Sequence, residues 1–463
     1  MGLYRIMTNA LCRILKVGLS GGICAGCLVF PAQALTLTEA CQSALLNDPF
    51  FKSDTYAAQA GMEEFNLGLS NLLPEVTLNA RKMDNRAQRD TYTNTNTLLT
   101  NEQLAYQSLG EGVYLRQPLF NLEKFSAYKA GTLHTEGAES QLVAGKQNAI
   151  LRVTGAFLDV IIAEQEVELA IAKKKTVTAQ AEQAAMFLSK GEATSAEADA
   201  VQSRLELASI QENEASDNKL IRVSTLSQLT AREVDALPEV IFDASQINRG
   251  NEPPQTLDQW LEMAIARNPE IIQKQQAVEL AENETKKYLS SYLPNVDLVA
   301  NVTRNNQDSF TTLNQDIRNR GIGIEMNWPL FKGGYYSALI RQARAKAEQA
   351  AQDVAAAKLR IRLEVERQYR GAVTGRLKLN ALSQAIKTDA EKIKSAELSF
   401  SAGVKTWVDV LAAQEDFFQA RKDYGNALKE FVMARLKLGA LAGSLGDDQI
   451  AWAEKYLQTN NFH

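Results

Sequence analysis

The sequence predicts an internally duplicated, mostly helical membrane protein in which several chains pool their strands to form one barrel. Three observations support this fold class. The segment LSNLLPEVTLNA at 69–80 recurs as LSSYLPNVDLVA at 289–300, so two halves of the 463-residue chain share one plan. Two very long stretches lack proline and are rich in helix-forming residues. Each half also holds two segments in which apolar and polar residues alternate.

The N-terminus and the charge limit the function classes. Residues 1–34 are predicted to be an export signal peptide, because a basic start and an apolar run precede the cleavage pattern Ala32-Gln33-Ala34. Removal of its three positive charges changes the net charge from −5 to −8. An acidic, exported chain is a poor candidate for nucleic-acid binding.

The cysteines indicate a fold without disulfides. Cys24 and Cys27 lie in the apolar run of the signal, and lipoprotein cleavage before Cys27 is the alternative to cleavage after Ala34. Cys41 alone then remains in the mature chain, so no internal disulfide can form. We expect Cys41 to fill one face of a helix as a small apolar residue.

The duplication predicts a first repeat at 35–245, a second at 246–445 and a C-terminal tail at 446–463. Each repeat begins with a predicted helix, at about 38–72 and 257–292. Proline disfavours helix at the residue before it, so Pro74 and Pro294 mark a border between helix and strand. After Pro74, Val76, Leu78 and Ala80 alternate with polar residues, which is typical of a strand with one apolar face.

A polar loop and a second strand are predicted next in each repeat. The loops cover 84–103 and 304–320, and the second strands end at Pro118 and Pro329. The predicted strands are about 8–10 residues long, which is near the length of a transmembrane β-strand. Trp328 and Tyr114 lie near strand ends, where aromatic residues form an interfacial belt.

A long helical hairpin completes each repeat. No proline interrupts 121–188 or 334–400, and at 1.5 Å per residue each stretch reaches about 100 Å as a helix. Gly191 and Gly403 are the predicted turn residues, because glycine tolerates a positive φ. A periplasmic coiled-coil adaptor or scaffold is the alternative that these helices alone leave open.

Four strands per chain require a partner if they enter lipid. Open sheet edges are not tolerated in hydrocarbon, and membrane barrels begin at eight strands. The strands therefore form a small soluble sheet, or several chains pool them. The apolar face, the polar loops and the signal peptide favour a pooled barrel in contact with outer-membrane lipid.

These features together resemble the TolC family of outer-membrane channel-tunnels. The resemblance rests on the duplication, on Asn47-Asp48-Pro49, on L-P-x-V-x-L, on PLFKGGYYSALIRQARA (329–345) and on GVKTWVDVL (403–411). It implies a homotrimer with twelve strands in a transmembrane β-barrel and, below it, a long α-helical barrel. It also implies a Gram-negative outer membrane location, a periplasmic adaptor (membrane fusion) protein and an inner-membrane transporter. Type I protein secretion is favoured, and efflux of drugs or small molecules is the alternative.

The resemblance also implies a gate at the periplasmic end of the hairpins. By position, Asp409 matches a constricting acid, Lys405 a basic latch residue, Phe400 a tyrosine and Glu197 their acidic partner. Ala412 stands where a second acid is common, and Phe400 lacks a hydroxyl group. We expect Lys405 and Glu197 to pair across the two hairpins.

Catalytic chemistry finds little support in the sequence. The two histidines, His134 and His463, lie outside any metal-ligand pattern. Nucleophile-elbow, zinc-protease and phosphate-loop motifs do not occur. The chain is therefore predicted to be no enzyme and to need no cofactor, and an exported enzyme is the third hypothesis.

Overall fold

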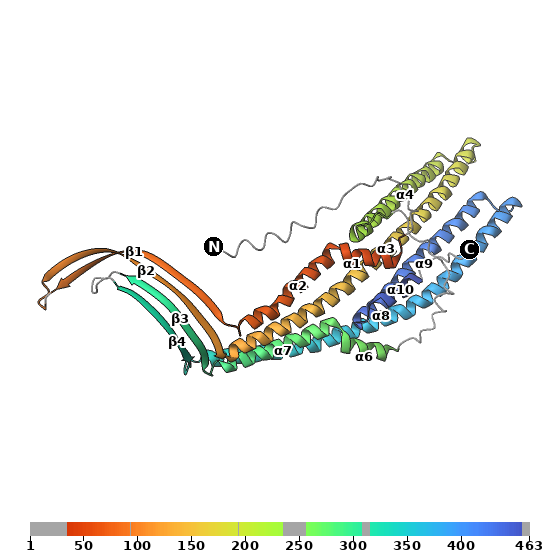
Figure 1. The fold of residues 1–463 in the computed structure, drawn as a ribbon. Coiled ribbons are helices and arrows are strands. Elements are labelled where there is room, and N and C mark those ends of the chain that lie inside the picture. The colour runs from red at the N-terminus through yellow and green to blue at the C-terminus, as the bar shows by residue number, and fades with distance from the viewer. Residues whose placement is uncertain (1–34, 93, 193, 235–255, 308–314, 456–463) are drawn as a thin grey trace, which may run out of the picture.

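A computed structural model describes residues 35–92, 94–192, 194–234, 256–307 and 315–455. A curved sheet forms one end of the molecule, and long helices run from it to two tips at the opposite end (Figure 1). No helix in these ranges is both long and apolar enough to cross a membrane. The elements in chain order are α1 (Leu37–Asn47), α2 (Pro49–Ser70), β1 (Glu75–Tyr92), β2 (Leu98–Phe120), α3 (Leu122–Ser189), α4 (Ser195–Thr230), α6 (Leu257–Arg267), α7 (Pro269–Ser290), β3 (Asn295–Gln307), β4 (Gln315–Asn327), α8 (Tyr335–Ser401), α9 (Trp407–Leu441) and α10 (Asp447–Lys455).

The duplication predicted from the sequence is visible in the order of the elements. Each repeat has two short helices, two strands, one very long helix and one shorter helix. The long helices α3 and α8 have 68 and 67 residues, and their bounds agree with the two proline-free stretches. The signal peptide with Cys27, and the border between the repeats at 245 and 246, lie outside the described residues.

The first helix of each repeat is broken, which corrects the prediction of single helices at 38–72 and 257–292. Asp48 separates α1 from α2, and Asn268 separates α6 from α7. Both residues precede a proline, and their ψ angles of 118° and 124° lie outside the helical region. Each side chain also accepts a hydrogen bond from the backbone of the following helix, so each is a helix cap.

The strands are much longer than the predicted 8–10 residues, and the loop predicted at 84–103 is wrong. β1 and β2 have 18 and 23 residues and pair without a break from Glu75–Arg116 to Thr91–Thr100. Polar cross-strand pairs such as Arg89–Glu102, at 2.6 Å, hold the outer part of this hairpin. Both faces of this outer part carry mostly polar side chains, so the composition alone suggested a loop. The loop predicted at 304–320 also belongs partly to β3 and β4.

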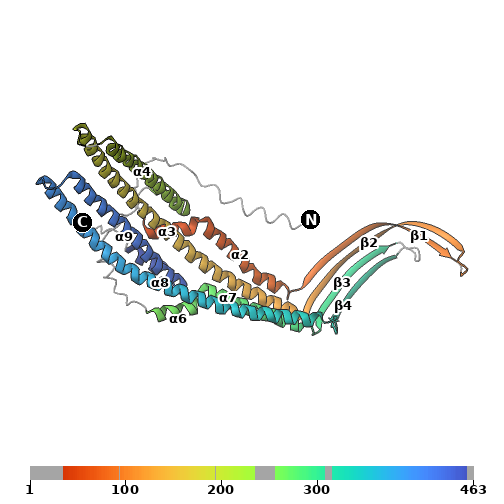
Figure 2. The same ribbon diagram turned by 180° about the vertical axis from the view of Figure 1, so that it is seen from behind.

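The four strands form one antiparallel sheet in the order β1-β2-β3-β4, and all four lie side by side in Figures 1 and 2. The register sets Val76, Leu115, Ala300 and Ile322 in one row across the sheet. Since side chains alternate between faces, one face is apolar over several rows and the other is polar. Tyr114 lies on the polar face, because its neighbours Val113 and Leu115 share the apolar one. Its predicted place in a lipid-facing aromatic belt is therefore wrong.

The predicted junction prolines lie where the chain changes structure. β1 and β3 begin directly after Pro74 and Pro294, as predicted. Pro118 lies inside the last residues of β2, at a shift of register, and β4 ends two residues before Pro329. The two repeats therefore leave the sheet at slightly different points.

The core lies in the middle of the helical part. Phe157 and Tyr424, from α3 and α9, are among its largest fully buried side chains. Cys41 is 2% exposed in the same core, which confirms its predicted role as a small apolar residue. The predicted tail contributes as well, because Ile450 of α10 is buried there and Glu454 accepts a hydrogen bond from the Thr38 backbone.

Candidate functional site

Both hairpin tips end in the same turn. Gly191 and Gly403 have φ angles of +74° and +72°, which confirms the predicted positive φ at both positions. After α3 the N–H of Glu192 donates to the Phe187 carbonyl, and after α8 the N–H of Val404 donates to the Ser399 carbonyl. This pattern closes the end of a helix with a left-handed glycine. No atom lies within 4 Å of a Cβ added at either glycine, so the backbone angle and not space requires glycine.

Asp409 lies at the start of α9, in the first turn of the helix. Its Oδ2 accepts hydrogen bonds from the Thr406 backbone N–H at 2.8 Å and from the Thr406 hydroxyl at 2.7 Å. The Thr406 hydroxyl group in turn accepts from the Asp409 N–H, which completes a capping box. These bonds, with a smaller contribution from the charge of Lys405, lower the pKa of the Asp409 carboxyl group. An exposed, ionised carboxylate is thus fixed beside the tip.

Glu197 has the equivalent place at the start of α4. Its Oε2 accepts from the Thr194 backbone N–H at 2.9 Å and from the Thr194 hydroxyl at 3.0 Å. The backbone bond and then the hydroxyl bond lower the pKa of the Glu197 carboxyl group. Each tip therefore carries one acid that is held by a threonine three residues earlier.

The other two predicted gate residues lie on the tip of the second hairpin. Lys405 is exposed beside the turn, and its backbone N–H donates to the Ser399 carbonyl. Phe400 packs its ring against Trp407, with ring centroids 5.4 Å apart. Both rings are more than two-fifths exposed, so an apolar pair is presented at this tip. Sequence reasoning had not singled out Trp407.

The structure places Lys405 and Glu197 on two different hairpins, whose tips are separate in both views (Figure 2). Within the described part of one chain, no ion pair joins Lys405 to Glu197. Ala412 is exposed on α9. Asp409 therefore contributes the acid nearest to the turn on this helix.

Ion pairs join the two hairpins below the tips. They connect α3 with α9 at Glu166–Lys422, 3.1 Å, and at Glu168–Arg421, 2.9 Å. The pair nearest to the tips is Lys173–Glu415, at 4.0 Å. Among the described residues nearer to the tips than Lys173 and Glu415, no ion pair joins α3 to α9, so these two helices are tied together least at their tips.

A second polar site lies on the polar face of the sheet, near the helices. Arg116 of β2 donates from Nε to Asp297 Oδ2 at 2.8 Å and from Nη2 to Glu325 Oε1 at 3.1 Å. The three residues come from three adjacent strands. The alternation of the sequence indicated a polar face, but only the register shows that these charges meet. Among the described residues, no group of His, Cys, Asp or Glu could hold a metal ion.

Comparisons with known proteins agree with this geometry. The family described as "Outer membrane efflux protein" matches residues 40–232 and 260–444, which cover both repeats. The alkaline protease secretion protein AprF of Pseudomonas aeruginosa is 26% identical over 420 residues, with 90% of this chain and 86% of AprF covered. The proteases secretion protein PrtF of Dickeya chrysanthemi is 24% identical, with 92% of each chain covered. The outer membrane protein TolC of Vibrio cholerae is also 24% identical, with 92% of this chain and 94% of TolC covered.

A solved structure supports the fold. The CmeC outer membrane channel of Campylobacter jejuni superposes with a TM-score of 0.68, at 16% sequence identity, with 91% of this chain and 90% of CmeC covered. At that identity the likeness concerns the fold alone. The matched family covers most of the chain and the TolC resemblance is confirmed, so this chain belongs to the outer membrane efflux protein family and is a Gram-negative outer-membrane channel protein that extends into the periplasm.

Proposed function

We propose that three copies of the chain form the passive exit duct of a tripartite export system. The observation that carries this proposal is the sheet itself. It has one apolar face and ends in two open edges, at β1 and β4. Three copies would pair these edges and supply twelve strands, an even number within the range of outer-membrane barrels. The helices would continue the tube through the periplasm, and a periplasmic adaptor with an inner-membrane transporter would supply the energy.

The duct is closed, in this proposal, at the periplasmic tips. Three copies of Asp409 around one axis would repel each other and attract cations, since clustered carboxylates make the local electrostatic potential more negative. Lys405 would meet Glu197 across hairpins, and Phe400 with Trp407 would add an apolar contact. The separation of the two tips in a single chain and the ionised acid on each of them support a closure of this kind.

The cargo is proposed to be protein, by type I secretion. This choice is supported by the names of AprF and PrtF, which are secretion proteins for proteases. Small-molecule efflux is the second candidate, because the family description names efflux. A soluble periplasmic scaffold gains no support, since a sheet with a broad apolar face would be exposed to water.

Deletion of the gene distinguishes between the two proposed classes of cargo, protein and small molecules. Loss of one or more proteins from the culture supernatant, with unchanged sensitivity to dyes, detergents and antibiotics, would support protein secretion. Increased drug sensitivity with unchanged secreted proteins would support efflux instead. A complementing copy that carries Pro294→Ala alters the border between helix and strand. Its migration on unheated gels, compared with that of the wild type, serves as a control for assembly.

A further inference from the structure

The apolar face of the sheet ends in charged residues on the side away from the helices. On this face, the apolar residues of each strand are followed by a charged residue. These charged residues are Lys82 on β1, Glu111 on β2, Arg304 on β3 and Arg320 on β4. These residues share the apolar face because each is two positions beyond Ala80, Val113, Val302 or Ile322. Three of these four boundary residues are basic, although the whole chain has a net charge of −5.

The boundary keeps a positive charge after its internal ion pairs are counted. Arg304 pairs with Asp316 at 2.9 Å and lies 3.7 Å from Glu111, so it engages both nearby acids. Arg318 lies 3.6 Å from the same Asp316 but remains 73% exposed. Together with Lys82 and Arg320, four basic residues stand against two acidic ones, which leaves two positive charges per chain.

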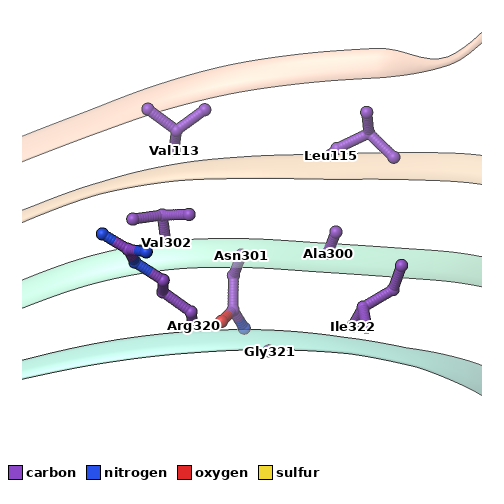
Figure 3. Close-up of a pocket in the computed structure, with 8 residues that line it drawn as sticks. All are labelled: Val113, Leu115, Ala300, Asn301, Val302, Arg320, Gly321 and Ile322. Atoms are coloured by element: carbon purple, nitrogen blue, oxygen red, sulfur yellow. The ribbon is translucent and has the colours of Figure 1, made fainter.

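Arg320 closes one end of an apolar groove. The groove has a volume of about 320 Å³ and lies between β2, β3 and β4. Figure 3 shows the Arg320 side chain extending from β4 towards Val302 on β3. In the ranges that the structure describes, Arg320 has no ion-pair or hydrogen-bond partner. The lining residues are Val113, Leu115, Ala300, Asn301, Val302, Arg320, Gly321 and Ile322.

We propose that this groove binds a phosphate-bearing lipid of the outer leaflet. Its acyl chain would lie against Val113, Ala300 and Ile322, and its phosphate group would meet Arg320 and Arg318. A guanidinium group suits phosphate oxygens because it can donate two parallel hydrogen bonds. A charged group beside hydrocarbon is costly unless it reaches the interface or a counter-charge. The site goes beyond export through the duct, and depends only on the outer-membrane location of the sheet.

The shape of the groove favours a lipid over a free anion. Free phosphate would use only the exposed guanidinium groups, and exposed ion pairs in water contribute little to binding. A lipid would in addition cover the apolar lining, and burial of apolar surface adds to its affinity. Phosphate chemistry alone is shared by both ligands, so the experiment must separate them.

The test uses the mature protein, purified in detergent, with native mass spectrometry to count bound lipid during a titration. The probes are lipid A with two phosphate groups and the same lipid after dephosphorylation. We expect Arg318→Gln combined with Arg320→Gln to weaken binding of the phosphorylated lipid at least about tenfold, the scale of one lost charge-assisted hydrogen bond. The wild type should bind the dephosphorylated lipid as weakly as the double variant binds the phosphorylated lipid.

Arg81→Gln is the matched control for the single variant Arg320→Gln, because Arg81 lies on the other face of β1 and its substitution removes the same single charge. It should bind lipid like the wild type, and every variant must migrate as the wild type on unheated gels. The single variant Arg320→Gln gives a second measurement if the double variant fails to assemble. Equal affinity of the double variant and the wild type would overturn the proposal. So would equal binding of both lipids, or complete displacement of bound lipid by millimolar inorganic phosphate.

Discussion

The indole Nε1 of Trp328 donates a hydrogen bond to the backbone carbonyl of Tyr292, at 3.0 Å, and ties the end of β4 to the end of α7. The first repeat makes the equivalent bond with another side chain. There Gln117 Nε2 donates to the Leu72 carbonyl at 2.9 Å. Each donor directly precedes the proline of a Pro-Leu-Phe segment, and each carbonyl lies just past a helix, where backbone acceptors lack helical partners. The two repeats therefore share a bond and differ in the residue that makes it.

We predict that Trp328→Phe weakens this junction, because phenylalanine keeps the ring and removes the N–H donor. The expected loss is about 1 kcal/mol, the net contribution of one hydrogen bond. It should appear as a lower temperature at which the folded form disappears from unheated gels. Trp407→Phe is the matched control, since that residue is similarly exposed and its indole N–H has no hydrogen-bond partner among the described residues. An equal temperature for the two variants would contradict the prediction.

A buried ion pair lies at the break between α1 and α2. The Asp48 side chain is fully buried, and its Oδ2 lies 2.8 Å from Arg152 Nη2 on α3. The Arg152 guanidinium group also lies over the Phe50 ring, 4.7 Å from its centroid. We predict that Arg152→Met costs about 3–5 kcal/mol of unfolding free energy, because it leaves a buried carboxylate without its counter-charge.

The second repeat provides the rescue for that variant. Asn268 occupies the position equivalent to Asp48 and still caps its helix through its side-chain oxygen. Asp48→Asn added to Arg152→Met should therefore recover part of the lost stability. Urea denaturation followed by circular dichroism measures both changes. Arg367→Met, which removes an exposed pair within α8, should change stability by well under 1 kcal/mol.

The long helices, their glycine turns and the strand starts could be predicted from the sequence, because each has a local cause. Proline at a border and a missing proline over 68 residues are read directly from the chain. The outer parts of β1 and β2 could not, because both of their faces are polar and no alternation marks them. The break at Asp48 has a signal, a residue before proline, but the same pattern also fits the start of a single helix.

The polar sites also include features that could be predicted from the sequence and features that could not. Thr406 and Asp409, like Thr194 and Glu197, have the spacing of a capping box, so their hydrogen bonds could have been predicted. The meeting of Arg116 with Asp297 and Glu325 could not, since it depends on a register that joins strands of different repeats. The ion pairs between α3 and α9 likewise depend on helix packing that no short motif encodes.

We predict that Asp409→Asn reduces the preference of the channel for cations and its block by divalent cations. Asparagine keeps an oxygen that can accept from Thr406, so the start of α9 should remain capped while one charge per chain is lost. Single-channel current in planar bilayers measures the change. Asp416→Asn is the control, because Asp416 lies further along α9 and is paired with Lys392. Unchanged cation preference and unchanged divalent-cation block in the single-channel current of Asp409→Asn would contradict the proposed role.

The dependence of the cation preference on pH has a defined sign. Hydrogen bonds from Thr406 lower the pKa of Asp409 below its ordinary value of 3.8. The carboxylate should therefore stay charged as the pH falls to 3.8, and lose its charge only below that value. Its capping contribution is present above 3.8 and is lost as the pH falls through the lowered pKa. Reversal potentials should change only at the acidic end of this range, whereas a loss of selectivity already at pH 5 would show that repulsion among three copies of Asp409 outweighs the hydrogen bonds from Thr406.

Loosening of the closed tips is predicted for Lys405→Ala combined with Glu197→Gln. Glutamine preserves the acceptor that caps α4, so the variant removes charge without removing the cap. We expect a higher conductance of the closed state, because the proposed contact between hairpins is lost. Lys190→Ala with Glu192→Gln removes the same charges from the first tip and should leave the conductance unchanged. The same closed-state conductance in both double variants would refute the latch.

Cys41 is predicted to be inert towards thiol reagents while the protein is folded. It is 2% exposed, its Sγ lies 3.9 Å from Thr154 Oγ1, and burial raises its thiol pKa from 9.0 to about 12. A reagent needs the thiolate, so maleimide at pH 8 should label Cys41 only after unfolding. Ser401→Cys in a Cys41→Ala background gives an exposed reference at the second tip. Because the folded pKa is the higher one, this thiol should add to stability below pH 9 and lose that contribution between pH 9 and 12. Cys41→Ala should remove that part of the alkaline loss, and labelling of folded Cys41 at the rate of the reference would show that the site is open.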